Sequence, residues 1–275
     1  LIMKFKILCV KFLLNIYYGL SDIKFIERLE NMNVVYIFKN SKTGNKILLK
    51  IFSSSKVDTI VFQNELAKYK LSPNLIKTNK GNIYIRVFKY LIFVQYFVEA
   101  SSRRIEYSEM VIFFKDFYAK LDYYKNFFLE TSIGFPNYKT NAISQHFSMI
   151  HGDLRPPNVI ITANNFSVID FEYLRLGVRE VEVIKYIVLY TNFNNCEVEI
   201  LYSKFLEAGI VEISLQESIR FLLFELLKSD FPEKYIVRIT LDYYNEIISE
   251  RIKLIEFCDN YLNKKKGGDL SVSRS

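Results

Sequence analysis

The feature that most constrains this chain is a pair of polar motifs in its middle. Residues 151–158 read His-Gly-Asp-Leu-Arg-Pro-Pro-Asn, and residues 169–172 read Ile-Asp-Phe-Glu. The first motif contains a carboxylate, Asp153, and an amide, Asn158, and the second adds the carboxylate of Asp170. Phosphoryl transfer from a nucleotide needs one carboxylate to orient the attacking hydroxyl and further oxygen ligands to hold magnesium ions. The spacing therefore predicts a kinase catalytic loop followed by a metal-binding aspartate.

Apolar residues between the two motifs indicate how the fold could bring them together. Two short apolar runs, at 159–161 and 166–169, are joined by Thr-Ala-Asn-Asn at 162–165, which is typical of a β-hairpin. Such a hairpin would place Asn158 before its first strand and Asp170 at the end of its second. The simpler alternative is a polar turn that happens to precede a strand, since Asp, Pro and Asn are ordinary turn residues. The agreement of the polar identities with the strand pattern favours the catalytic interpretation.

These motifs resemble those of the aminoglycoside phosphotransferase and choline kinase group of small-molecule kinases, which share the protein-kinase fold. The catalytic loop of that group reads His-Gly-Asp-Leu-His-x-x-Asn, and its metal-binding aspartate lies in Ile-Asp-Phe/Trp-Glu. The resemblance implies that Asp153 is the catalytic base and that Asn158 and Asp170 bind metal. It also implies that His151 organises the loop. Arg155 replaces the second histidine of the group and would place a cation near the transferring phosphoryl group, where it could assist catalysis.

The first hundred residues can supply a nucleotide site. β-rich runs at 34–38 and 46–52 predict a hairpin, and Lys50 lies inside its second strand. A helical run at 62–69 follows, where the kinase fold has the helix whose glutamate pairs with the strand lysine. We therefore expect Lys50 to pair with Glu65 and to steady the phosphates of ATP, although a solvent-facing lysine is the commoner case in a strand.

A further apolar run at 90–99 begins as a strand and ends where the resemblance places the hinge between two lobes. Kinases of this group bind adenine through backbone groups, so the resemblance implies that Gln95 contributes a carbonyl and Phe97 an amide. Residues 27–33 would cover the phosphates but contain no glycine, unlike the glycine-rich loop of protein kinases. No Gly-x-x-x-x-Gly-Lys-Ser/Thr sequence occurs, which excludes a P-loop kinase.

Helical periodicity begins after this hinge and returns after the second motif. Apolar residues recur at helical spacing in 111–121, 219–227 and 235–261, which predicts a helical second lobe. The acceptor pocket should lie between these helices and the catalytic loop. Acidic and aromatic residues that could line it for a cationic acceptor are Asp230, Asp242, Tyr243, Tyr244 and Glu246. Each of them is more simply interpreted as part of a charged helix surface.

The expected architecture is an α+β, bilobal protein-kinase-like fold. Residues 1–98 would form a nucleotide-binding lobe, with an antiparallel sheet, one main helix and an additional N-terminal helix. Residues 99–266 would form a mostly helical lobe with the catalytic loop and the acceptor site, and residues 267–275 a disordered tail. A chain of 275 residues that is 50% hydrophobic can bury a core of this size.

The remaining composition excludes several other classes. Cys9, Cys196 and Cys258 are widely spaced, which argues against a zinc ribbon or a disulfide framework and favours a reducing, cytoplasmic location. The apolar run at 7–19 is interrupted by a charge and is too short for a bilayer span, so an amphipathic helix is expected there. The net charge of +7 is diffuse and no nucleic-acid motif occurs. We therefore expect no membrane or nucleic acid as a partner, and a monomer or homodimer.

Together these features predict an ATP- and Mg²⁺-dependent phosphotransferase that moves the γ-phosphate to a hydroxyl group of a small molecule. The segment after Asp170 reaches a helix near Val181 and leaves no room for the long activation segment of protein kinases. The resemblance implies an amino sugar, an amino alcohol, a sugar or a similar metabolite as the acceptor. Two alternatives stay open. One is a protein Ser/Thr kinase, and the other is a catalytically weak, nucleotide-binding regulatory protein, which the glycine-free loop would favour.

Overall fold

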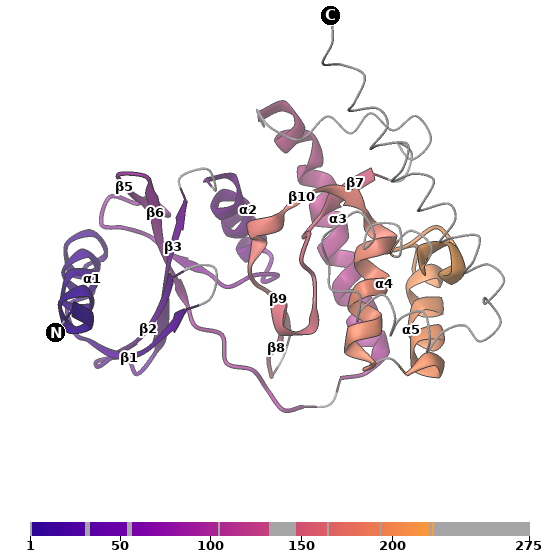
Figure 1. The fold of residues 1–275 in the computed structure, drawn as a ribbon, viewed down its shortest axis with the longest axis horizontal. Helices are drawn as coiled ribbons and strands as arrows, with labels where there is room; N and C mark the ends of the chain where they lie inside the picture. Colours follow the sequence, from indigo (N-terminus) through magenta and orange to yellow (C-terminus); the bar gives the residue numbers. More distant parts are fainter. Residues whose placement is uncertain are drawn as a thin grey trace, which may run out of the picture.

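A computed structural model of the chain describes residues 2–30, 34–53, 57–103, 105–131, 147–163, 165–192, 194–219 and 222. Within these residues the chain forms an N-terminal lobe around a six-stranded sheet and a second lobe built mainly of helices (Figure 1). This is the α+β, bilobal arrangement predicted from the sequence. The division into lobes at residues 98 and 99 stays a proposal.

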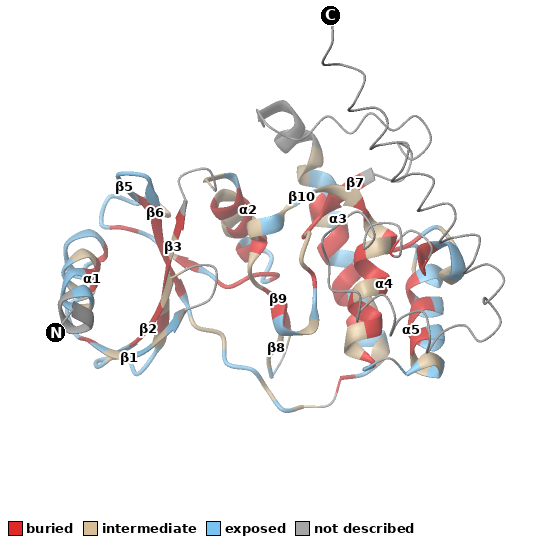
Figure 2. Cartoon of the chain, viewed as in Figure 1, coloured by how far each residue is buried: buried red, intermediate tan, exposed pale blue. Residues whose placement is uncertain are grey.

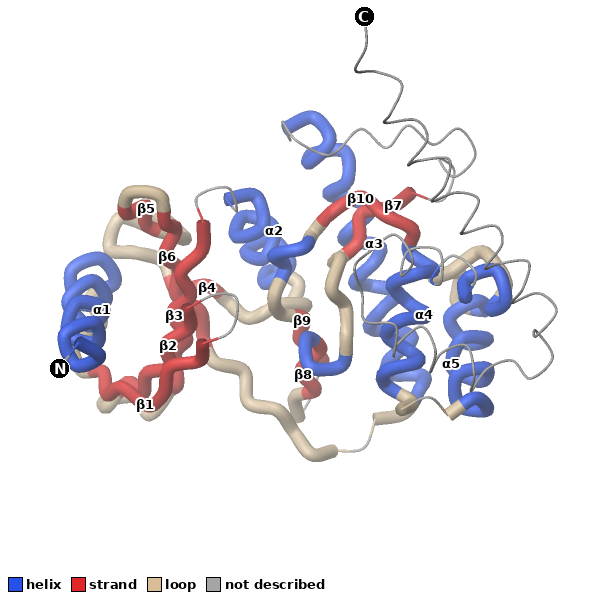
Figure 3. The backbone as a smooth tube through the Cα atoms, in the orientation of Figure 1, coloured by secondary structure: helices blue, strands red, loops and turns tan. Residues whose placement is uncertain are grey.

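The N-terminal lobe is an antiparallel sheet with a helix on each side (Figure 3). Its strands follow the order β1-β2-β3-β6-β4, and β5 also pairs with β6. The hairpin predicted at 34–38 and 46–52 is present as β2 and β3. In chain order the elements are α1 (Ile2–Tyr18), β1 (Ile23–Glu30), β2 (Val34–Asn40), β3 (Lys46–Ser53), α2 (Val57–Lys68), β4 (Leu75–Ile76), β5 (Ile85–Val87) and β6 (Tyr90–Tyr96).

The two faces of strand β3 have different neighbours because successive side chains of a strand point to opposite faces. Ile47 and Leu49 belong to the buried cluster that α1 covers. Phe52 belongs to the cluster that contains Ile60 of α2. Lys50 is two residues before Phe52 in the same strand, so their side chains point to the same face of the sheet. This face is the one toward α2 and the second lobe. The N-terminal helix expected from the apolar run at 7–19 is present as α1.

The second lobe is organised around the long helix α3, whose buried face is predominantly aromatic. Phe113, Phe114 and Phe117 pack in one cluster with Phe166 of a short hairpin and Phe205 of a later helix. Figure 2 shows buried residues in red along the helices of this lobe. The elements are α3 (Tyr107–Thr131), β7 (Phe147–Ile150), the 3-10 turn η3 (Pro156–Asn158), β8 (Val159–Ile161), β9 (Phe166–Val168), the 3-10 turn η4 (Phe171–Tyr173), β10 (Arg175–Val178), α4 (Arg179–Tyr190) and α5 (Asn195–Glu207). Strand β7 pairs with β10 and β8 pairs with β9, both antiparallel.

Several sequence predictions concern residues that the structure does not describe. The helical run at 111–121 is confirmed as part of α3. The run at 235–261, most of the run at 219–227, the tail at 267–275, residues 31–33 of the glycine-free loop and Cys258 lie outside the described residues. Among the helices that are described, none is long and apolar enough to cross a membrane.

Candidate active site

The hairpin formed by β8 and β9 brings Asn158 and Asp170 close together, as the sequence predicted. Asn158 ends the 3-10 turn immediately before β8, and Asp170 follows β9 after one residue. The backbone N–H of Ile169 donates to the carbonyl oxygen of Asn158 over 2.9 Å, which joins the two ends of the hairpin. Asp170 has a left-handed backbone, with φ 65° and ψ 56°, a conformation that Asp tolerates better than most residues.

Asp153 lies within a group of polar side chains that hold its carboxylate. The Nδ2 atom of Asn158 donates to the Asp153 carbonyl over 2.8 Å and to Asp153 Oδ2 over 3.2 Å. The Nε atom of Arg155 lies 3.1 Å from the same carboxylate oxygen. The Nζ atom of Lys185 in α4 lies 3.6 Å from Oδ1. The Asp153 side chain is nevertheless 23% exposed, so an acceptor can reach it.

The donor atoms at this point fit a magnesium ion bound together with a nucleotide. Because the amide nitrogen of Asn158 faces Asp153, its amide oxygen points away from that carboxylate. The described part of the chain contains no cluster of three or more His, Cys, Asp or Glu residues that could hold a metal by itself. Mg²⁺ is usually held by one or two protein oxygens, with phosphate and water completing its shell. Asn158 and Asp170 can provide these oxygens.

Lys50 reaches the same point from the other lobe. Its side chain is buried, at 6% exposure, and its ammonium group forms an ion pair with the Asp170 carboxylate. The predicted pair between Lys50 and Glu65 is wrong. Glu65 instead binds Lys68 over 2.6 Å and accepts a hydrogen bond from the Tyr124 hydroxyl over 3.1 Å.

The local geometry of α2 explains this correction. Lys68 follows Glu65 by three residues and therefore lies on the same face of the helix. Its hydrogen bond is the main reason that the pKa of the Glu65 carboxyl is lowered. Tyr124 approaches from α3, so Glu65 has two partners that do not involve strand β3.

The hinge segment continues the sheet. The backbone N–H of Phe97 donates to the Lys46 carbonyl over 3.0 Å, which extends the ladder between β3 and β6. The predicted contact between this amide and adenine stays a proposal. The Gln95 side chain is buried and accepts a hydrogen bond from Gln63 of α2 over 2.8 Å. The carbonyl role of Gln95 stays a proposal.

His151 connects the two motifs from a fully buried position. Its Nε2 atom lies 2.8 Å from the Ile169 carbonyl oxygen, and its Nδ1 atom accepts the backbone N–H of Asp153 over 3.3 Å. Burial lowers the pKa of the imidazole despite the nearby carboxylates. A neutral ring satisfies both contacts if Nε2 carries the proton. These are the contacts that an organiser of the loop would make.

Glu182 of α4 binds the backbone of the catalytic loop. Its carboxylate accepts the N–H of His151 over 3.0 Å and the N–H of Gly152 over 2.5 Å. It also accepts the hydroxyl of Tyr118 over 3.0 Å. No role was predicted from the sequence for Glu182 or for Lys185, which lies one turn later on the same helix. The sequence feature that could have indicated these roles is an acid and a lysine three residues apart on an amphipathic helix.

The acidic and aromatic acceptor residues predicted from the sequence lie outside the described residues. They are Asp230, Asp242, Tyr243, Tyr244 and Glu246. The described part of the acceptor side is therefore the face of the catalytic loop around Asp153, where the nearest charged partners are the cations of Arg155 and Lys185.

Comparisons with known proteins agree with this geometry. A model of a phosphotransferase enzyme family matches residues 136–206, the segment that contains both motifs. Spectinomycin phosphotransferase in complex with ADP and spectinomycin is 12% identical, with a TM-score of 0.57 over 92% of this chain and 93% of that chain. A microcompartment-associated aminopropanol kinase is 9% identical, with a TM-score of 0.58 over 92% of this chain and 94% of that chain.

Amicoumacin kinase, solved with AMP-PNP and Ca²⁺, is 14% identical, with a TM-score of 0.55 over 94% of this chain and 93% of that chain. The comparison with curated proteins gives no significant match. These structures show that the chain has the protein-kinase-like fold of small-molecule kinases. The resemblance to the aminoglycoside phosphotransferases and related small-molecule kinases is confirmed.

Proposed function

We propose that this protein is an ATP-dependent kinase that phosphorylates a hydroxyl group of a small molecule. The observation that supports it most is the convergence of separate segments on one point. The catalytic loop contributes Asp153 and Asn158. Strand β3 and the end of the β8–β9 hairpin contribute the pair of Lys50 and Asp170. These are the groups that kinase chemistry requires in one place.

Asp153 is proposed to orient the acceptor hydroxyl and to accept its proton as the oxygen attacks. Its carboxylate is held by Asn158 and flanked by Arg155 and Lys185, so it needs little rearrangement before the reaction. Bound MgATP would supply the γ-phosphoryl group and leave as ADP, and Asn158 and Asp170 would hold the ion that neutralises the phosphates. Lys50 positions the Asp170 carboxylate and has further N–H groups for a phosphate oxygen.

The acceptor is proposed to be a sugar, an amino alcohol, an amino sugar or a similar metabolite. The related structures with spectinomycin phosphotransferase and aminopropanol kinase support this range.

A panel assay tests this proposal. ATP consumption would be measured with Mg²⁺ and with amino alcohols, sugars, aminoglycosides and a generic peptide, for the native chain, for Asp153→Asn and for the exposed control Asp116→Asn. We expect one small acceptor to stimulate turnover, Asp153→Asn to lower kcat about a thousandfold, and the control to match the native chain. Stimulation by the peptide alone would favour a protein kinase. Tight ATP binding without turnover on any acceptor would favour a regulatory protein.

A further inference from the structure

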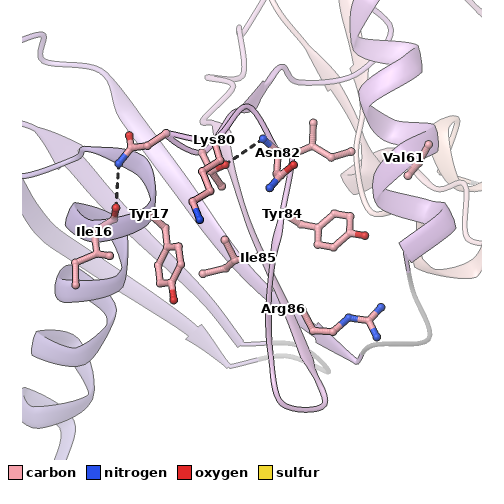
Figure 4. A pocket seen from close by; sticks show the side chains of 11 residues that line it. Ile16, Tyr17, Val61, Lys80, Asn82, Tyr84, Ile85 and Arg86 are labelled. Carbon is pink, nitrogen blue, oxygen red and sulfur yellow. Dashed lines mark hydrogen bonds between the residues drawn. The ribbon is translucent and has the colours of Figure 1, made fainter.

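A pocket lies in the N-terminal lobe, away from Asp153 and its neighbours. It has a volume of about 700 Å³ and opens between the C-terminal end of α1, the middle of α2 and the segment 78–86 that leads into β5 (Figure 4). This volume is typical of sites for small organic molecules. None of the residues proposed to be catalytic, metal-binding or nucleotide-binding lines it.

Hydrogen bonds fix the rim of this pocket. The Asn79 side chain donates to the Ile16 carbonyl over 2.9 Å, and the Asn79 backbone N–H donates to the Tyr17 carbonyl over 2.7 Å. The backbone N–H of Asn82 donates to the Thr78 hydroxyl over 3.0 Å. The segment 78–82 is thus held both to itself and to the end of α1. A wall fixed in this way does not have to be ordered when a ligand binds, which favours binding.

The side chains at the pocket combine aromatic faces with positive charge. Figure 4 shows Tyr17, Lys80, Tyr84 and Arg86 around the cavity, with Ile85 between them. No acidic residue is among the described residues that line it. An ammonium group and a guanidinium group without a carboxylate between them attract an anion, and tyrosine rings offer flat apolar surfaces.

We propose that this pocket binds a small organic anion that carries an aromatic ring, such as an aryl phosphate. The ring would lie against Tyr17 and Tyr84, and the anionic group would be bound by Lys80 and Arg86. This site is distinct from the proposed kinase site and does not depend on it for binding. It is a second, effector site in the same lobe that holds Lys50.

Helix α2 connects the pocket with the candidate active site. Val61 of this helix lines the pocket. The next residue, Phe62, packs edge-to-face on Phe171, with ring centroids 5.8 Å apart, and Phe171 directly follows Asp170. Gln63 donates to Gln95 at the end of β6 over 2.8 Å. A ligand that shifts or stiffens α2 therefore acts on residues adjacent to the metal ligand and the hinge, which is a physical route for regulation.

Calorimetric titration of the full chain with 2-naphthyl phosphate tests the binding. AMP-PNP and Mg²⁺ would be present at saturation, so that the probe cannot occupy a nucleotide site. We expect binding by the native chain, a loss of affinity of at least about tenfold in the double variant Lys80→Gln/Arg86→Gln, and no change in Lys77→Gln, an exposed lysine outside the pocket. Because the altered side chains are exposed, the variants should fold normally.

Three results would overturn the proposal. The first is that the native chain does not bind the probe at about 1 mM. The second is that the double variant binds the probe as tightly as the native chain does, and the third is that the native chain binds uncharged 2-naphthol as tightly as the probe. Hydrogen exchange tests the connection through α2 without any turnover. We expect the probe to slow exchange in residues 57–68 and 169–173 of the native chain and not of the double variant. Unchanged exchange in both segments despite binding would rule out the regulatory role.

Discussion

The ammonium group of Lys50 and the carboxylate of Asp170 form an ion pair although 120 residues separate them in the chain. Lys50 lies in strand β3 of the first lobe, and Asp170 ends the β8–β9 hairpin of the second. The lysine is buried, whereas the Asp170 side chain is 41% exposed. The pair therefore fixes one oxygen of Asp170 and leaves part of the carboxylate open to a metal ion.

Replacing Lys50 with Met should reduce catalysis while the fold is kept. Met has a similar length but cannot bind Asp170 or a phosphate, so we expect kcat/KM for ATP to fall about a hundredfold or more. Lys50→Arg should restore little, because the planar guanidinium does not fit a buried position shaped for an ammonium group. Steady-state kinetics at varied ATP would show this, with the exposed Lys24→Met as the control. A native kcat/KM in Lys50→Met would contradict the proposed role.

Glu182→Gln should weaken both the fold and the catalytic loop. The buried carboxylate accepts hydrogen bonds from two backbone N–H groups and one hydroxyl. The side-chain amide of Gln would replace one accepting oxygen with an NH₂ group, which would then face a donor. We expect the free energy of unfolding to fall by about 2–3 kcal/mol and kcat to fall as well. Urea unfolding and turnover would be compared with the exposed control Glu199→Gln. A stability loss as small as that of the control would mean that the loop does not depend on this carboxylate.

The positions of Asn158 and Asp170 could be predicted because they are set by local structure. Both flank a hairpin of a few residues, and its register follows from the apolar pattern of the two strands. The strand that carries Lys50 was predictable for the same reason. In these cases the sequence neighbours of a residue determine where its backbone lies.

The partners of these residues could not be predicted, because they depend on how distant elements pack. Lys50 could have paired with any carboxylate that the second lobe brings near it, and its sequence neighbours do not single out Asp170. The bond between the Phe97 amide and the Lys46 carbonyl depends on how far the ladder between β3 and β6 extends, which is a tertiary property. Lys185 approaches Asp153 only because α4 packs against the catalytic loop. Spacing within one motif contains none of this information.

Gly152→Ala should be strongly destabilising for a steric reason. Gly152 has φ +83°, and a Cβ atom added there would lie 2.0 Å from the Tyr173 carbonyl oxygen, where backbone would have to move. Gly209 is the matched control, since it has φ +68° and nothing within 4 Å of an added Cβ. We expect Gly209→Ala to cost about 1 kcal/mol, from backbone strain alone, and Gly152→Ala to cost clearly more. Equal costs in chemical unfolding would show that the loop can move away from Tyr173.

His151 should make the stability of the protein depend on pH in the acidic range. Burial lowers its pKa from the usual 6.5, so the unfolded chain binds a proton that the folded chain does not. The contribution of the neutral ring is therefore complete above pH 6.5 and is lost as the pH falls below it, with a limiting slope of about 1.4 kcal/mol per pH unit. His151→Gln cannot titrate, so its unfolding free energy should fall less steeply between about pH 7 and pH 5. Urea unfolding of both chains over this range measures the difference, and parallel curves would mean that His151 has the same pKa in the folded and the unfolded protein.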